Sequence, residues 1–150
     1  MRFSRACFTC LFSLALTLGL QAQTFKPANS TNAKNFLGTW QARFHGKVFV
    51  TLKLVGNPQK LNGTMSKASV DLNQDGSLAS AEPNDGSNSI INARVNGKEM
   101  HFTSKSSDGT GDAVNWEIVL AGAGEAELQP IVPPDVPKPK PWKLTRVPRS

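Results

Sequence analysis

The stretch from Trp40 to Val55, WQARFHGKVFVTLKLV, decides the fold of this chain. Its apolar and polar side chains alternate, and the two-residue period is interrupted only by the dipeptide His45-Gly46. Because successive side chains of a β-strand point to opposite faces of a sheet, this period predicts two strands joined by a tight turn. The alternation places Val48 and Val50 on the apolar face of this hairpin and Phe49 on the opposite face.

The same period recurs along the rest of the chain, between turn signals such as Gly56-Asn57-Pro58, Asn96-Gly97 and Ala121-Gly122-Ala123-Gly124. Ile91, Ala93 and Val95 share one predicted face, and residues 71–88 are polar and predict a connection. Further strands are expected over residues 61–70, 91–95, 100–102, 114–120, 126–132 and 142–147.

These elements predict an all-β fold, an up-and-down antiparallel meander of about eight strands that closes into a small barrel. Pairing the first strand with the last removes both exposed edges of the meander. A Pro-rich crossing over residues 133–141, PPDVPKPKP, gives the closing strand its reach. The expected core comprises Trp40, Phe44, Val50, Leu52, Met65, Val95, Phe102, Trp116, Ile118 and Leu144.

The N-terminus carries the pattern of a secretory signal peptide over residues 1–22. Arg2 and Arg5 precede an uncharged apolar run from Ala6 to Leu20, and a small residue, Ala22, marks the expected cleavage point. The run is too short to span a bilayer, so we expect no membrane span. Residues 23–34 predict a polar linker, and residues 35–150 a single domain. The sequence therefore predicts a secreted or periplasmic protein.

The charge of the mature domain is mild. Loss of Arg2 and Arg5 lowers the 17 basic residues to 15, against 11 acidic residues, and leaves about +4. Five of the 15 lie in the last thirteen residues, so the basicity belongs to the tail rather than to a groove. We expect no nucleic-acid partner. Both cysteines of the chain, Cys7 and Cys10, leave with the signal peptide, so the core alone must stabilise the domain.

The segment Asn35-Phe36-Leu37-Gly38-Thr39-Trp40 resembles the opening of lipocalins and other calycins, in which a Gly-x-Trp on the first strand plugs one end of the barrel. An arginine on the last strand commonly covers that tryptophan in this family. Arg146, on the alternation face of Trp142 and Leu144, matches it. The resemblance covers the two ends of the domain and implies a lipocalin-like barrel whose mouth or outer face holds a small apolar molecule or a partner.

Residues 71–82, DLNQDGSLASAE, match the spacing of an EF-hand calcium loop. The side chains of Asp71, Asn73, Asp75 and Glu82, with the backbone carbonyl of Ser77, are the expected calcium ligands. The flanking residues alternate like strands and Pro83 follows at once, so the helix pair of an EF-hand is missing. Two interpretations stay open here: a calcium site in a non-helical setting, or an ordinary solvated turn.

Catalytic motifs are sparse. The two histidines, His45 and His101, fall on distant predicted strands, so neither a zinc site nor a Ser-His-Asp arrangement is expected. The sequence favours a secreted, non-catalytic binding module for an unknown small molecule or a cell-surface or extracellular partner. A calcium-binding protein acting through residues 71–82 is one alternative. A secreted hydrolase or accessory subunit with an unrecognised site is another.

Overall fold

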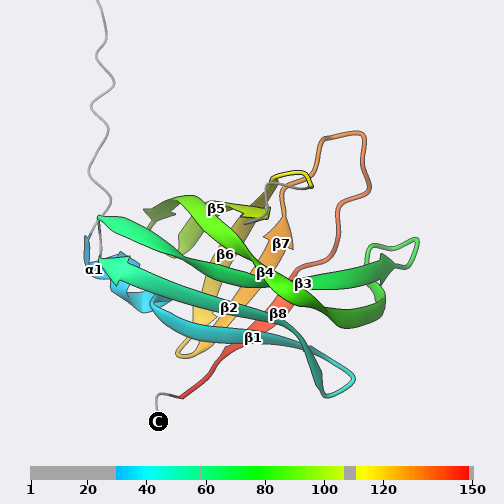
Figure 1. Cartoon of the computed structure of the whole chain (residues 1–150), viewed down its shortest axis with the longest axis horizontal. Helices are drawn as coiled ribbons and strands as arrows, with labels where there is room; N and C mark the ends of the chain where they lie inside the picture. The colour runs from blue at the N-terminus through cyan, green and yellow to red at the C-terminus, as the bar shows by residue number, and fades with distance from the viewer. Residues whose placement is uncertain (1–29, 58, 107–110, 149–150) are drawn as a thin grey trace, which may run out of the picture.

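The chain forms a closed barrel of eight antiparallel strands that are paired in sequence order (Figure 1). The computed structural model describes residues 30–57, 59–106 and 111–148. The strands are β1 (Gly38–Phe44), β2 (Lys47–Asn57), β3 (Lys60–Leu72), β4 (Leu78–Asn96), β5 (Glu99–Ser106), β6 (Val114–Gly122), β7 (Glu125–Pro130) and β8 (Trp142–Arg146). β1 pairs with β8, which closes the barrel. The predicted all-β meander is confirmed.

One end of the barrel is closed by the short helices α1 (Ser30–Ala33) and η1 (Lys34–Phe36), which lie at the same end as the turns joining β4 to β5 and β6 to β7 (Figure 1). Ala33 and Phe36 are fully buried. The last residues of the segment expected to be a linker therefore pack on the barrel, while residues 23–29 lie outside the described part. Burial of two apolar side chains explains this helical turn in a segment that has no helical period.

Trp40 fills the closed end. Its indole Nε1 donates a hydrogen bond to the Phe36 carbonyl at 2.9 Å, and the guanidinium carbon of Arg146 lies 4.4 Å from its ring centroid. Arg146 also donates from Nη1 to the Leu37 carbonyl at 3.1 Å and from Nη2 to the Asn35 carbonyl. The predicted cover of Trp40 by Arg146 is confirmed.

Two β-bulges overturn predicted side-chain directions. Val50 lies opposite Ala42 and Val48 opposite Arg43, so Phe49 has no cross-strand partner of its own. Phe49 and Val50 are consequently both buried, while Val48 is only half-buried. The prediction that Phe49 faces outward is wrong, because a bulge inserts one residue and shifts the alternation that follows it.

The second bulge lies in β4, where Ile91 pairs with Thr103 but Arg94 pairs with His101. Asn92 and Ala93 together lie opposite Phe102, and Asn92 has a positive φ of 55°. Ile90 therefore points into the core and Ile91 is exposed, the reverse of the prediction. Of the ten predicted core residues, Phe44 alone is not buried; at the β1–β2 turn its ring stacks on His45.

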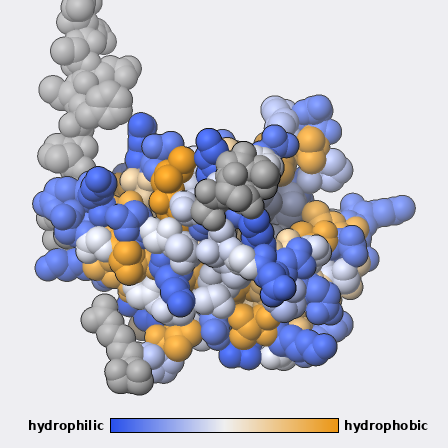
Figure 2. All heavy atoms as spheres, in the orientation of Figure 1, coloured by the Kyte–Doolittle hydropathy of each residue, from blue (hydrophilic) through white to orange (hydrophobic). Residues whose placement is uncertain are grey.

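Residues 71–88 are not a loose connection. β3 and β4 continue as a hairpin arm, and the register runs as far as Leu72 opposite Leu78, so only residues 73–77 form the turn. The crossing that follows β7 docks on this turn: the Lys140 amide donates to the Gly76 carbonyl at 2.8 Å, and Gly76 and Pro139 are buried. On the face shown in Figure 2, hydrophobic residues are scattered among hydrophilic ones.

Candidate functional site

A cavity of about 310 Å³ lies at the end of the barrel where β8 begins, opposite the end that Trp40 closes. Its apolar wall includes Val50, Met65, Trp116 and Trp142. The two indole rings lie 5.5 Å apart between centroids and are tilted by 57°, and Phe49 meets Trp142 edge-on at 5.4 Å. Bulged Phe49 thus supports one of the aromatic rings that line the cavity.

Polar side chains interrupt this apolar wall. Trp116 donates its Nε1 proton to the hydroxyl of Ser104 at 2.9 Å, and Ser104 is the buried polar residue of the described chain. By contrast, Trp142 Nε1 and Asn88 Oδ1 are buried without a hydrogen-bond partner among the described residues. Both residues line the cavity. A buried polar atom without a partner costs about 1–3 kcal/mol, so this donor and this acceptor need an explanation.

Sequence reasoning missed Trp142, Asn88 and Ser104 as site residues. Ser104 continues the alternation of Met100 and Phe102, a signal that was available. Asn88 lies two residues before Ile90 and therefore points inward as Ile90 does. The bulge at Asn92 shifts the alternation, so a period of two counted back from Val95 predicts the opposite direction for Asn88.

A larger hollow of about 580 Å³ lies outside the closed end. Its lining includes the small residues Gly97, Gly122, Ala123 and Gly124 and the polar or charged residues Asn32, Asn35, Lys98 and Arg146. None of its described lining residues is aromatic. The cavity lined by Trp116 and Trp142 is smaller, but it has the aromatic rings and polar atoms that a specific site needs.

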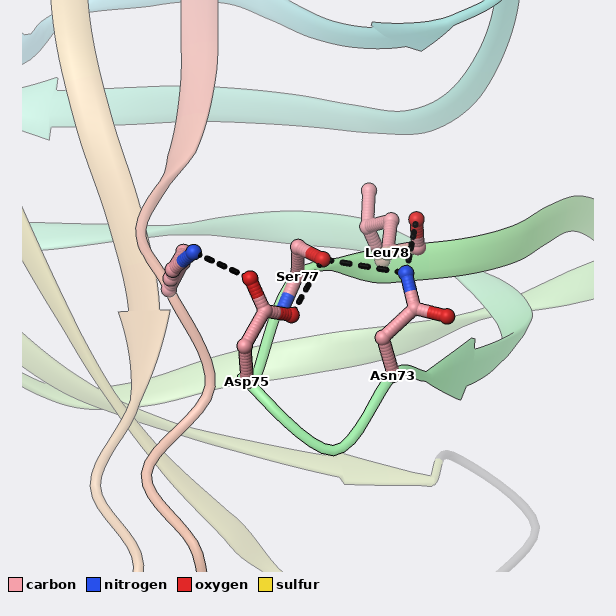
Figure 3. Close-up of polar contacts among 5 residues, drawn as sticks. Asn73, Asp75, Ser77 and Leu78 are labelled. Atoms are coloured by element: carbon pink, nitrogen blue, oxygen red, sulfur yellow. Dashed lines mark hydrogen bonds and ion pairs between the residues drawn. The ribbon is translucent and has the colours of Figure 1, made fainter.

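The structure brings three of the five predicted calcium ligands together at the β3–β4 turn (Figure 3). Asp75 Oδ1 accepts hydrogen bonds from the amide and hydroxyl of Ser77 at 3.0 and 2.6 Å. Asn73 Nδ2 donates to the Ser77 hydroxyl at 3.0 Å. The ammonium of Lys140, from the crossing, contacts Asp75 Oδ2 at 2.5 Å. A protein cation therefore already occupies one face of the central carboxylate.

The other two predicted ligands lie on the hairpin arm rather than in the turn. Asp71 accepts a hydrogen bond from the Ser80 hydroxyl at 2.6 Å, and Glu82 is exposed opposite Ser69. The carbonyl of Ser77 accepts from the Asn73 amide at 2.8 Å. The spacing of an EF-hand loop is thus folded as a tight hairpin, which separates its first and last carboxylates from the middle one.

The hydrogen bond from Lys140 holds the pKa of the Asp75 carboxyl well below its usual range, and the two hydrogen bonds from Ser77 act in the same direction. Since the folded pKa is below the unfolded value, the contribution of Asp75 to stability is complete above about pH 4 and is lost as the pH falls toward the folded value. Both side chains of the pair are more than half exposed, so solvent screens this contribution.

Calcium binding at this turn stays a prediction. To bind there, the ion must displace the ammonium of Lys140 from the Asp75 carboxylate. We expect weak binding, with a Kd of about 10⁻⁴–10⁻³ M, and several-fold tighter binding in Lys140→Gln. Calorimetric titration measures both values. Lys138→Gln is the matched control, because it removes the same charge two residues away. Equal changes of calcium affinity in Lys140→Gln and Lys138→Gln would contradict displacement of Lys140 from Asp75. So would the absence of a heat of calcium binding in wild type and both variants.

No protein-family model, curated protein or solved structure matches this chain. In the described ranges, none of the helices has the length and apolar character needed to cross a membrane.

Proposed function

We propose that this protein is an exported, non-catalytic binding protein with a lipocalin-like barrel, and that it holds a small planar ligand in the cavity that Trp116 and Trp142 line. The observation that carries the proposal is a pair of buried polar atoms, Trp142 Nε1 and Asn88 Oδ1, which have no hydrogen-bond partner in the described part of the chain and belong to residues that line the cavity. A ligand that presents an acceptor to the indole and a donor to the amide would satisfy both atoms. Buried polar groups without a partner need an explanation, and a ligand bound among aromatic rings and a few polar groups provides one.

The size and chemistry of the cavity limit the ligand. Its volume of about 310 Å³ lies at the lower end of the range of about 300–1,000 Å³ found for ligand pockets. The lining side chains supply rings, amides and hydroxyls, and among the lining residues that the structure describes Lys67 is the one titratable group. This composition favours binding over acid–base chemistry. The Gly-x-Trp opening with Arg146 over Trp40 supports the lipocalin-like assignment.

Replacing Asn88 by leucine should change stability and ligand binding in opposite directions. Since the Asn88 oxygen is buried and none of the described residues is its hydrogen-bond partner, an apolar side chain of similar size should raise the free energy of unfolding by about 1 kcal/mol. The same change should weaken binding of benzamide, a planar probe with one carbonyl and one amide donor. Trp142→Phe keeps a ring but loses the donor, and should weaken benzamide binding about tenfold.

Trp fluorescence and calorimetry measure benzamide binding, and thermal unfolding measures stability. Asn62→Leu, at an exposed position of β3, is the matched control and should leave binding unchanged. N,N-dimethylbenzamide, which lacks the amide donor, should bind wild type more weakly than benzamide does. Equal benzamide binding by wild type, Asn88→Leu and Trp142→Phe would overturn the proposal.

A further inference from the structure

The outer wall of the barrel carries a group of side chains that is separate from the cavity. Glu99 and His101 lie two residues apart on β5, so their side chains share one face, and Glu117 of β6 lies directly opposite His101. One ligand atom from each of the three lies within 4.8 Å of the others, and His101 Nε2 is 3.7 Å from Glu117 Oε1. The barrel thus holds one imidazole and two carboxylates at a single point.

A neighbouring strand fixes the orientation of Glu117. Gln129 of β7 lies opposite Glu117, and its Nε2 donates a hydrogen bond to Glu117 Oε2. The other oxygen, Oε1, is the one directed at His101. Hydrogen bonds of this kind orient the ligating groups of metal sites and set which oxygen is available to the ion.

We propose that Glu99, His101 and Glu117 bind a divalent transition-metal ion, Zn²⁺, with the remaining coordination position open to water. One nitrogen and two carboxylate oxygens are ligands that Zn²⁺ accepts, and three protein ligands with an open position form a recurrent arrangement. Calcium prefers six to eight oxygens, which three side chains with one imidazole do not provide. The site therefore differs in ion preference from the predicted calcium loop at residues 71–82.

The surroundings set the expected strength of the site. A hollow of about 270 Å³ lined by His101, Glu117 and Gln129 lies beside it and leaves room for the open position. Lys138 lines the same hollow, and exposed Arg94 of β4 lies opposite His101. These two cations offset the charge of the carboxylates, so we expect moderate affinity and a stronger site when Lys138 is replaced by Gln.

The sequence did not predict this site, because a zinc site is recognised in a sequence from several histidines or cysteines at metal-ligand spacing. His101 is the one histidine involved, and its partner Glu117 lies sixteen residues away, on a strand whose register the sequence does not state.

The test is a titration of the untagged protein with Zn²⁺ by calorimetry, followed by Co²⁺ substitution and visible absorption. Wild type should bind one Zn²⁺, and its Co²⁺ form should show the visible absorption bands of an ion with few ligands. His101→Gln and Glu117→Gln should each lower the Zn²⁺ affinity at least about tenfold, and Gln129→Leu, at a positioning residue, about tenfold. Zn²⁺ should raise the Tm of wild type but not that of His101→Gln.

Two matched controls exist, His45→Gln for the other histidine and Glu127→Gln for an exposed carboxylate of β7, and both should bind Zn²⁺ like wild type. All variants lie on the barrel surface, and their Tm without metal verifies that they fold. Absence of Zn²⁺ binding by wild type, or binding that His101→Gln leaves intact, would overturn the proposal. Loss of Zn²⁺ binding in His45→Gln alone would overturn it as well, because the ion would then lie elsewhere.

Discussion

Replacing Trp40 by alanine should lower the free energy of unfolding by about 3–5 kcal/mol, the range for removal of a large buried aromatic side chain. Trp40 is 1% exposed and its indole supports three groups at once. It contacts the core, donates to the Phe36 carbonyl and lies under the Arg146 guanidinium. Without the indole, η1 and the last residue of β8 lose their common contact, and the closed end is left with a cavity.

Chemical denaturation of Trp40→Ala measures this loss. Trp40→Phe should cost less, because it keeps a ring under Arg146 and loses only the hydrogen bond and part of the volume. Val55→Ala is the control for apolar truncation, since Val55 is 56% exposed, and should change stability by no more than about 0.5 kcal/mol. A loss below about 1 kcal/mol in Trp40→Ala would show that the closed end does not depend on the indole.

Gly63→Ala should be at least as damaging, with an expected loss of about 3 kcal/mol or more. Gly63 lies in β3 opposite Leu54 and has a φ of +153°. An added Cβ would lie 1.8 Å from the Lys53 carbonyl oxygen and 2.9 Å from its carbon. These atoms belong to the backbone of the paired strand, so relief requires β2 and β3 to separate.

Two other glycines make the comparison specific. Gly97 has a φ of +62° with no atom within 4 Å of an added Cβ, so Gly97→Ala should cost only the left-handed backbone term of about 1–2 kcal/mol. At Gly122, open space again surrounds the added Cβ, and alanine there should be nearly neutral. Urea unfolding of the three variants should rank them Gly63, Gly97, Gly122. Equal losses at Gly63 and Gly97 would contradict the collision with Lys53.

The barrel could be predicted from the sequence because its two determinants are local. The alternation around Trp40 and Leu52 identifies strands and their inner faces, and dipeptides such as Asn96-Gly97 mark the turns. The predicted side-chain directions were wrong at Phe49 and Ile91. A bulge depends on how two strands pair, and the residues of one strand do not record it.

The candidate sites were less predictable for a related reason. Residues 71–82 match the spacing of a calcium-binding loop. Pairing of Leu72 with Leu78 and docking of Lys140 on Asp75 fold them as a tight hairpin instead. In the cavity, Trp142 and Asn88 come from strands that are distant in the sequence. Their shared position depends on barrel closure, which tertiary pairing determines.

Closure of the barrel also has a kinetic consequence. The contact between Leu37 and Arg146 spans 109 residues, so the entropy of closing a long loop opposes the seam between β1 and β8. During synthesis β1 must wait for the C-terminal residues before its free edge is paired. Docking of Lys140 on Asp75 closes a smaller loop of 65 residues and brings β8 near its position. We expect folding to finish at this seam, slowly and at high contact order, with the Pro-rich crossing as an intermediate anchor.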